Sequence, residues 1–273
     1  MKFKHRRQLE ASEGDLTPMI DMTFQLIAFF MVLINFTEVE QDQRITLPAS
    51  ELAQPPDQPY DEPLTVQITK DETILFARDE LEPDALLPAL RREASIIRAY
   101  EKQLSDVTII IRADATVRTG VVQDAISACQ EAEFETFALR GKTSSEDTLI
   151  MRDFNIRMPL PSEDTQPQPL ETPTLRLRLA SNDDGSLQSV SLGEKSFGNG
   201  PEAFAQLHQY LRTLIQDDGG PGAGDEPEVE IDADYNLRYD YTIRAITAIS
   251  GYRENNDTHT LVEKIRFTPP KKP

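Results

Sequence analysis

The feature that most constrains this chain is its one long apolar run, from Met19 to Phe36, which carries a carboxylate, Asp21, close to its start. A helix over that run is about 27 Å long at about 1.5 Å per residue, close to the ~30 Å hydrocarbon core of a bilayer. We therefore expect a single transmembrane helix over residues 17–36. Every later apolar run is too short to cross a bilayer, which excludes a polytopic transporter.

The charges around the run predict its orientation. Lys2, Lys4, Arg6 and Arg7 precede it, whereas the first basic residue after it is Arg44. Because basic residues stay on the cytoplasmic side, we expect residues 1–16 to form a cytoplasmic tail and the residues after the helix to be exported. A cleaved signal peptide is the alternative, but residues 35–43 contain no small-residue cleavage site.

Polar residues of the predicted helix gather on one side. At 100° per residue, Thr17, Gln25 and Asn35 fall within about 40° of the Asp21 direction. A polar stripe inside a bilayer must meet protein or water, so the chain needs a membrane partner, either a second copy or a polytopic protein. A carboxylate removed from water is penalised in its charged form and can then bind and release protons. The alternative is that Asp21 lies idle in the headgroup region, but Gln25, one turn deeper, favours a working site.

Composition excludes several other functions. The formal net charge of −19 falls almost wholly on the exported part, which argues against nucleic acid or anionic lipid as its ligand. Cys129 is the only cysteine, so no intrachain disulfide can form. His5, His208 and His259 lack the spacing of metal ligands, and no catalytic constellation or nucleotide motif is present. We therefore expect no metal, no cofactor and no enzymatic activity.

Two motifs flank the apolar run. The segment from Asp15 to Met22 reads DLTPMIDM, and the segment from Arg44 to Ser50 reads RITLPAS. In order, spacing and residue type they resemble the ExbD/TolR family of proton-driven inner-membrane proteins. A looser similarity covers residues 60–142, where IRAD at Ile111–Asp114 is followed by a predicted helix.

The resemblance implies an accessory subunit of a motor in the bacterial inner membrane, with a homodimer of the helix held inside a ring of ExbB/TolQ-like subunits. The acid at the position of Asp21 then takes protons from the periplasmic side and passes them inward. The segment containing Arg44, Leu47 and Pro48 is implied to bind a partner or control the channel. Work is delivered to a TonB- or TolA-like energy transducer.

The chain is longer than typical members of that family, and its extra residues look like a second copy of the first domain. The pattern Ala113, Asp114, Arg118, Ala125, Ile126, Ala128 recurs as Ala233, Asp234, Arg238, Ala245, Ile246, Ala248, at an offset of 120. Leu64–Ile68 is likewise echoed by Leu175–Leu179. A weaker echo of residues 44–48 at 157–161, offset by 113, extends the repeat into the linker.

Each copy predicts two strands, a helix, a strand, a helix and a strand, which is an α+β or α/β fold of ββαβαβ type with helices on one face. In the first copy the expected elements are 64–68, 73–76, 83–100, 107–112, 117–131 and 136–140. In the second they are 175–179, 187–192, 201–215, 228–231, 239–252 and 261–267. The expected organisation is an extended periplasmic linker at 37–62, a first domain at 63–142, a Pro-rich linker at 143–173 and a second domain at 174–273.

Some polar residues of the two copies have ordinary structural interpretations. Asp114 and Asp234 follow a strand and are expected to cap the next helix. Arg118 and Arg238 are expected to pair with these acids, to bind a partner or simply to be solvated. Cys129 lies on the apolar side of its predicted helix and is expected to be buried.

The sequence thus favours a subunit that converts proton motive force into mechanical work on a periplasmic or outer-membrane-linked partner. The alternative is a single-pass anchored binding or scaffold protein, whose tandem domains hold an envelope component while Asp21 only pairs within a helix bundle. A flagellar-type stator subunit shares the logic of the helix, but the C-terminal half contains no segment of the peptidoglycan-binding kind.

Overall fold

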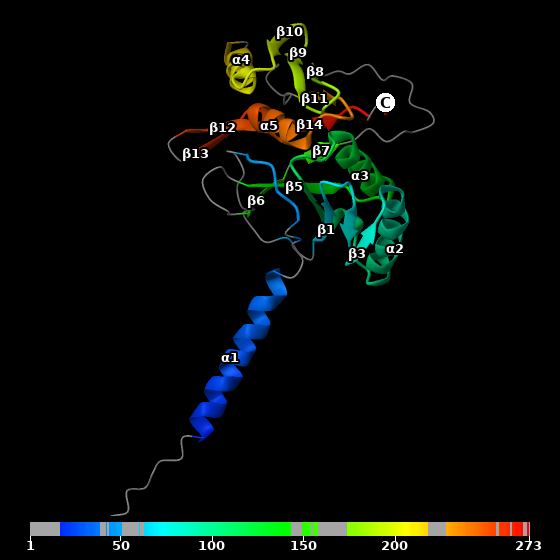
Figure 1. Cartoon of the computed structure of the whole chain (residues 1–273), viewed down its shortest axis with the longest axis vertical. Coiled ribbons are helices and arrows are strands. Elements are labelled where there is room, and N and C mark those ends of the chain that lie inside the picture. The colour runs from blue at the N-terminus through cyan, green and yellow to red at the C-terminus, as the bar shows by residue number, and fades with distance from the viewer. Residues whose placement is uncertain are drawn as a thin grey trace, which may run out of the picture. The chain divides into compact units, whose positions relative to one another are not determined.

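The computed structural model describes residues 17–38, 42, 44–50, 60, 63–142, 149–153, 155–157, 174–217, 228–254, 257–262, 264–269 and 272 (Figure 1). It divides into two compact units, Met1–Asp42 and Gln43–Pro273.

The first unit contains one helix, α1 (Thr17–Glu38), which confirms a helix over the apolar run. Pro18 is tolerated because it lies in the first turn, where its missing N–H leaves no helical bond unmade. Every described side chain of the helix, from Thr17 to Met31, is exposed. Within the described residues, no helix is both long and apolar enough to be identified as a membrane span.

The first domain of the second unit is a six-stranded mixed sheet in the order β3-β2-β1-β4-β5-β6. Strands β1, β4 and β5 run parallel, as expected for strands joined through helices. Its elements are β1 (Leu64–Ile68), β2 (Ile74–Phe76), β3 (Asp79–Leu81), η1 (Pro83–Ala85), α2 (Leu86–Ala99), η2 (Leu104–Asp106), β4 (Thr108–Ala113), α3 (Thr119–Glu131), β5 (Thr136–Lys142) and β6 (Leu149–Asp153).

The second domain repeats this arrangement in the order β10-β9-β8-β11-β14-β7, with β8, β11 and β14 parallel. A separate two-stranded sheet joins β12 and β13. The elements are β7 (Asn155–Arg157), β8 (Thr174–Ser181), β9 (Leu187–Leu192), β10 (Lys195–Gly198), α4 (Ala203–Asp217), β11 (Glu228–Ala233), α5 (Tyr239–Ser250), β12 (Gly251–Glu254), β13 (Asp257–Thr260) and β14 (Lys264–Phe267).

Strand register shows that the domains are copies of one fold. Ile68 pairs with Ala113 in the first sheet, and Leu179 pairs with Ala233 in the second. The next residue repeats the match, because the amide of Asp114 donates to Ile68 O at 2.9 Å and that of Asp234 donates to Leu179 O at 3.0 Å. The repeat inferred from the offset of 120 is therefore confirmed for the domains.

The structure adds short strands that the sequence pattern did not predict. Strands β3, β6, β7 and β10 extend both sheets, and the expected strand at 261–267 begins only at Lys264 because β12 and β13 form a hairpin before it. These strands have three to five residues, too few for alternation to be recognised. Residues 158–161, which carry most of the weaker linker echo, lie outside the described residues.

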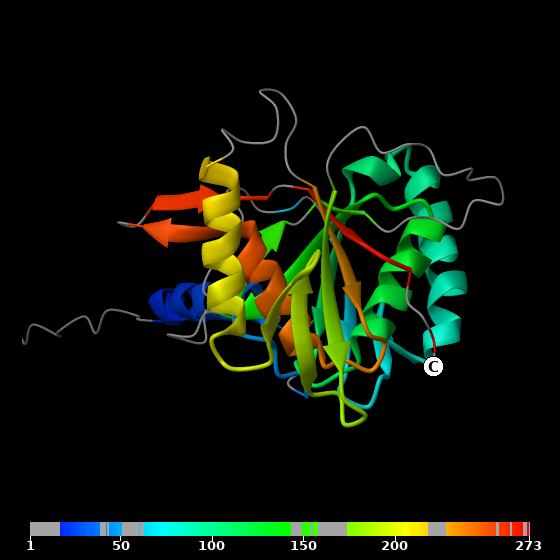
Figure 2. The ribbon, with the colours of Figure 1, turned by 90° about the horizontal axis from the view of Figure 1, so that it is seen from above.

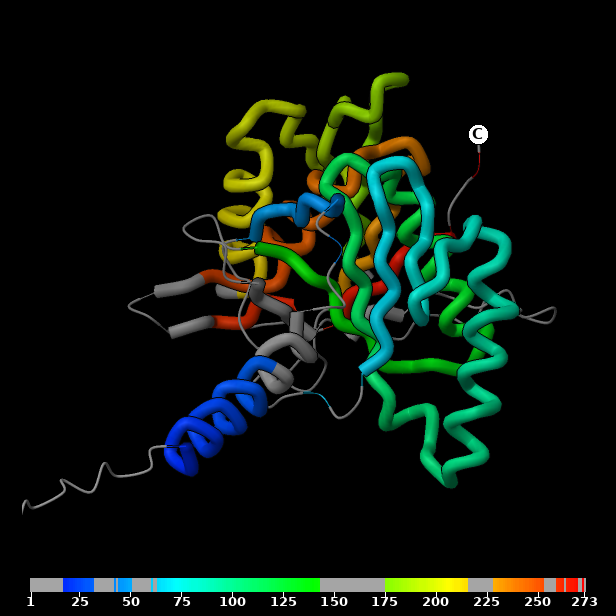
Figure 3. The backbone as a smooth tube through the Cα atoms, turned by 60° about the horizontal axis from the view of Figure 1, so that its bottom comes forward, coloured from blue at the N-terminus to red at the C-terminus, as the bar shows by residue number. Residues whose placement is uncertain are grey.

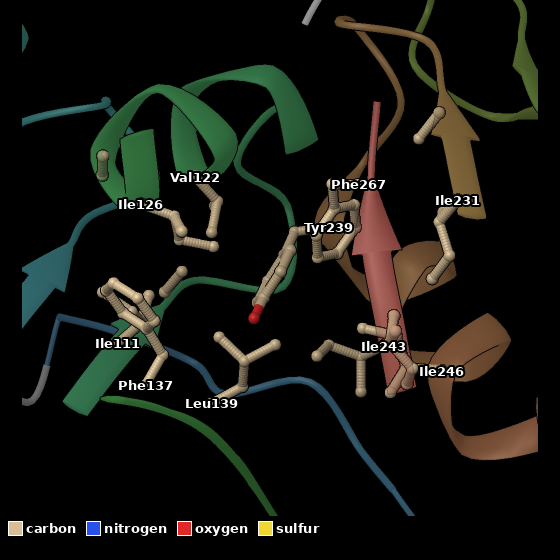
Figure 4. Close-up of a cluster of buried hydrophobic side chains, with 14 of the residues drawn as sticks. Ile111, Val122, Ile126, Phe137, Leu139, Ile231, Tyr239, Ile243, Ile246 and Phe267 are labelled. Atoms are coloured by element: carbon tan, nitrogen blue, oxygen red, sulfur yellow. The ribbon is translucent and has the colours of Figure 1, made fainter. Parts of the chain in front are cut away.

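The two domains share one hydrophobic core, which contains buried side chains from both sheets and from all four domain helices. In Figure 2, α2 and α3 lie to one side of the strands and α4 and α5 to the other. Figure 4 shows the ring of Tyr239, from the start of α5, directed toward Val122, Ile126 and Leu139 of the first domain. Only residue 154 separates β6, paired with the first sheet, from β7, paired with the second.

Candidate functional site

Asp21 and Gln25 form the polar pair of α1. They lie one turn apart, and Gln25 Nε2 donates to Asp21 Oδ2 at 3.3 Å. This places the two side chains on one side of the helix, as the periodicity predicts. Thr17, one turn before Asp21, begins the helix, whereas Asn35 lies beyond the described side chains.

The rest of the described helix is apolar and uncovered. Phe24, Leu26 and Ile27 are 57–69% exposed, and among the described residues from Met22 to Met31 there is no charged side chain. Thr23 is the remaining polar group of this stretch, and its hydroxyl donates to Met19 O at 2.6 Å within its own helix. A continuous apolar surface of this kind marks a site for lipid or for another protein.

The segment Arg44–Ser50 is bound to the first domain and is not free. The Thr46 amide donates to Asp114 Oδ2 at 2.7 Å, the Ala115 amide donates to Thr46 O at 2.8 Å, and the Ser50 amide donates to Lys142 O at 2.7 Å. Figure 3 shows this segment, in lighter blue, beside the end of β5. The segment therefore extends the edge of the domain at the ends of β4 and β5.

The three residues predicted to bind a partner are not equally accessible. Leu47 is 4% exposed and Pro48 is also buried. Arg44 is exposed and forms an ion pair with Glu80 at 2.7 Å, with both side chains more than half exposed. Exposed ion pairs of this kind contribute between about 0 and 1 kcal/mol to the free energy of folding. A partner can reach Arg44 directly, but Leu47 and Pro48 only after the segment has moved.

The prediction that Asp114 and Asp234 cap helices is wrong. Helices α3 and α5 begin later, and their cap positions are occupied by Arg118 and Arg238, without a side-chain cap bond. Asp114 instead accepts hydrogen bonds from the Thr46 amide and, at its other oxygen, from the Thr116 amide at 2.9 Å. Each acid is separated from the first residue of its helix by four residues, which places the carboxylate too far from the first helical amides.

Asp234 has the same anchoring function in the second domain. Its Oδ2 accepts from the Ser181 amide at 2.8 Å, and its Oδ1 accepts from Arg178 Nη2. Each acid thus binds the backbone of a neighbouring segment at the end of its sheet.

The arginines of the repeat make different contacts from those expected. Arg118 binds Glu72 through two short hydrogen bonds, each 2.5 Å, and the Glu72 carboxylate raises the pKa of Arg118. Arg238 donates to the Tyr241 hydroxyl at 2.8 Å. Sequence reasoning missed Glu72 because it lies in the turn before β2, 46 residues from its partner. Cys129 is fully buried, as predicted, and burial raises the pKa of its thiol.

Among the described residues, no group of His, Cys, Asp and Glu side chains could hold a metal ion. The residues that the sequence predicts for a site lie in two places, on α1 and in the anchored segment after it.

Comparison with known proteins assigns the chain to a family. Residues 7–144 match the family of the biopolymer transport protein ExbD/TolR, a range that contains α1, the anchored segment and the first domain through β5. Neither the curated proteins nor the solved structures contain a match to the chain. The matched range is half of the chain, and the second domain lies beyond it. This chain therefore belongs to the ExbD/TolR family of biopolymer transport proteins.

Proposed function

We propose that this chain is the proton-carrying subunit of a motor in the bacterial inner membrane, which uses proton motive force to do mechanical work on a periplasmic or outer-membrane-linked partner. Membership of the ExbD/TolR family implies the subunit of a biopolymer transport motor. In this proposal α1 spans the membrane with its N-terminus in the cytoplasm, and both domains lie in the periplasm.

The observation that carries the proposal is the pair Asp21 and Gln25 on a helix that is otherwise apolar and exposed. A carboxylate on such a helix is costly in lipid, so it must face protein or water. The Gln25 side-chain amide, one turn away on the same helix, donates one hydrogen bond to the Asp21 carboxylate. This is the one polar contact that the helix itself supplies to the carboxylate among the described residues. The remaining polar surface then comes from a second copy of α1 and from an ExbB/TolQ-like ring, with Thr17 and Asn35 on the same stripe.

Proton transfer at Asp21 requires no cofactor. Uptake of a proton from the periplasmic side neutralises the carboxylate, and release toward the cytoplasm restores its charge. Each elementary charge that crosses the membrane yields about 2.3 kcal/mol per 100 mV. That energy is available to move the paired helices within the ring, and the exported domains pass the movement to a TonB- or TolA-like transducer.

The anchored segment Arg44–Ser50 has a place in this proposal. Leu47 and Pro48 are buried while the segment is bound to the first domain, and the exposed Arg44 side chain forms a surface ion pair with Glu80. We assign the bound form to a state in which this segment is withheld from its partner. Release of the segment would then make Leu47 and Pro48 available for binding.

Asp21→Asn tests the proposal, because asparagine keeps the shape and the oxygen that accepts from Gln25 but cannot carry a proton at neutral pH. The full chain is expressed with its co-purifying membrane partner, and the complex is reconstituted in liposomes containing a pH-sensitive dye. We expect proton flux to fall to that of protein-free liposomes, while the amount of chain in the membrane stays unchanged. Asp21→Glu should retain part of the flux.

Thr23→Val is the matched control, because it removes a hydroxyl that donates to the backbone of its own helix, at Met19 O and Ile20 O. It should leave the flux intact. Normal flux in Asp21→Asn liposomes would reject the motor. Loss of the Asp21→Asn chain from the membrane would instead indicate a structural acid, as in an anchored scaffold protein.

A further inference from the structure

The two domains meet along a seam formed by residues 115–120 of the first and residues 235–240 of the second. Arg118 and Arg238 form an antiparallel bridge at its centre. The Thr119 amide donates to Leu237 O at 2.7 Å, and the Tyr239 amide donates to Val117 O at 2.9 Å. Each of these backbone hydrogen bonds joins the first residue of one helix, α3 or α5, to the loop that precedes the other helix.

The seam has the pattern of a two-fold axis. A second pair of bonds runs from the Gly120 amide to Tyr235 O at 3.0 Å and from the Asp240 amide to Ala115 O at 3.0 Å. In each pair, the residues of one hydrogen bond are the repeat equivalents, at an offset of 120, of the residues of the other. Such reciprocity is typical of the contact between two identical subunits, but here both halves belong to one chain.

The side chains of the seam are not symmetric. The Tyr235 ring lies over Gly120, and a Cβ at position 120 would fall well inside van der Waals contact with Cδ2 of that ring. The Tyr235 hydroxyl donates to Asp124 Oδ2 at 2.9 Å, and the Arg118 guanidinium lies 5.2 Å from the ring centre. Burial and the Asp124 carboxylate raise the pKa of Tyr235 to about 12.

The opposite half of the seam has different residues at the equivalent positions. By the offset of 120, Tyr235 corresponds to Ala115 and Gly120 corresponds to Asp240. Two first domains paired in this way would place Ala115 over Gly120 and leave a void where the ring lies. Two second domains would place Tyr235 against Asp240, which has a side chain where the ring requires glycine.

Other contacts also require one domain of each kind. Tyr239 is 1% exposed and is directed into the first domain, whereas its equivalent Thr119 has a hydroxyl that hydrogen-bonds to that of Thr242 at 2.8 Å (Figure 4). Lys272, near the end of the second domain, forms an ion pair with Asp124 of α3 at 3.3 Å. The seam is therefore complementary between the domains and not self-complementary.

We propose that the second domain is the built-in partner of the first, so that the seam closes within one chain and copies of the chain associate through other surfaces. The proposal rests on contacts outside α1 and stands whether or not Asp21 carries protons. It gives the duplicated domain a function, which is to occupy a face of the first domain that would otherwise be free to pair with another copy.

Disulfide cross-linking tests where the seam closes. Arg118 and Arg238 face each other as a non-hydrogen-bonded antiparallel pair, for which the Cα separation is about 4.5 Å, within the range of disulfides. The full chain carrying Arg118→Cys and Arg238→Cys is oxidised in its membranes, and products are separated without reductant. We expect a cross-linked species of monomer mass, with the 118–238 linkage identified by peptide mass spectrometry.

The single variants decide between pairing within and between chains. If first domains paired with each other, Arg118→Cys alone would give a cross-linked dimer through its own two-fold axis. If second domains paired, Arg238→Cys alone would do so. Co-expression of the two single variants detects exchange of domains between chains. A cross-linked dimer in any of these samples would overturn the proposal, as would failure of the double variant to cross-link.

Two controls accompany the experiment. The parent chain retains Cys129, which is fully buried and should not react. The variant with Thr116→Cys and Asn236→Cys places its thiols at equivalent but unpaired positions, because Thr116 lies opposite Asp240 in the register of the bridge, four residues from Asn236. It should remain uncross-linked.

Discussion

Gly120 lies in the first turn of α3, where alanine is ordinarily the better residue by about 1 kcal/mol because glycine loses more backbone entropy on folding. The Tyr235 ring reverses this preference, since it occupies the space of a methyl group at position 120. We predict that Gly120→Ala destabilises the chain by about 1–3 kcal/mol, the usual cost of overpacking. Urea unfolding of the full chain measures the change in free energy.

A double variant identifies the cause. In Gly120→Ala with Tyr235→Ala the clash is gone, so the second substitution should cost less in the Gly120→Ala background than in the parent chain. Gly200→Ala is the control, because a Cβ at that position meets no atom of the described part of the chain within 4 Å. Equal costs of Tyr235→Ala in both backgrounds would show that the ring does not lie over Gly120.

At the level of elements, Asp114 connects the anchored segment to the sheet. The Thr46 amide donates to the Asp114 carboxylate, and the next residue of the segment is the buried Leu47. We predict that Asp114→Ala speeds hydrogen exchange at Thr46 by about tenfold, the change expected when a hydrogen bond of roughly 1.5 kcal/mol is lost. Hydrogen exchange of the full chain, read by mass spectrometry, measures this rate.

Asp234→Ala is the matched control, because Asp234 holds Ser181 of the second domain in the same way. It should speed exchange near Ser181 and leave Thr46 unchanged. If Asp114→Ala left exchange at Thr46 unaltered, the segment would be held by its other contacts alone.

The elements that the sequence predicted best are those with a strong apolar pattern. Helix α3 was expected at 117–131 and is found at Thr119–Glu131, and β9 was expected and found at 187–192. Strand β3, with the sequence DEL, has two exposed acidic residues and no pattern that distinguishes it from a turn. Its pairing with β2 decides its conformation, and such pairing is a tertiary effect that local propensity does not contain.

The polar pairs on the two central strands were also beyond prediction. In the first domain Arg112 donates to Gln67 at 2.6 Å, and at the equivalent position of the second domain Arg178 binds Asp232 at 2.9 Å. The arginine has moved to the other strand, so the position keeps a hydrogen-bonded pair while no residue is retained. The two copies therefore differ in residue type at these positions, yet the shared strand register places a hydrogen-bonded pair at the same point of both sheets.

The site shows the same division between local and distant contacts. The pair Asp21 and Gln25 followed from helix periodicity, since residues four apart share a face. The seam joins positions 120 residues apart, and the repeat indicated two copies without indicating that they face each other. The constant offset of 120 indicates that the two domains have the same fold. It does not indicate which surfaces of the domains are in contact, which the bridge between Arg118 and Arg238 shows.

For the whole of the second unit, the shared core has a thermodynamic consequence. A single hydrophobic cluster spans both domains, and Tyr239 extends from one into the other. Neither domain can lose its packing without exposing apolar surface of its neighbour, so the two domains should unfold together. Independent tandem domains would instead unfold in separate transitions.

Tyr239 provides the test of this coupling. Tyr239→Ala removes a fully buried ring and should cost about 3–5 kcal/mol. Tyr239→Phe should be neutral or stabilising, because the buried hydroxyl has no hydrogen-bond partner among the described residues. Hydrogen exchange in increasing denaturant gives a midpoint for peptides of each domain. We expect one common midpoint in the parent chain and a lower midpoint for both domains in Tyr239→Ala, since a residue of the second domain then also stabilises the first. A lower midpoint confined to the second domain would mean that the two cores are thermodynamically separate.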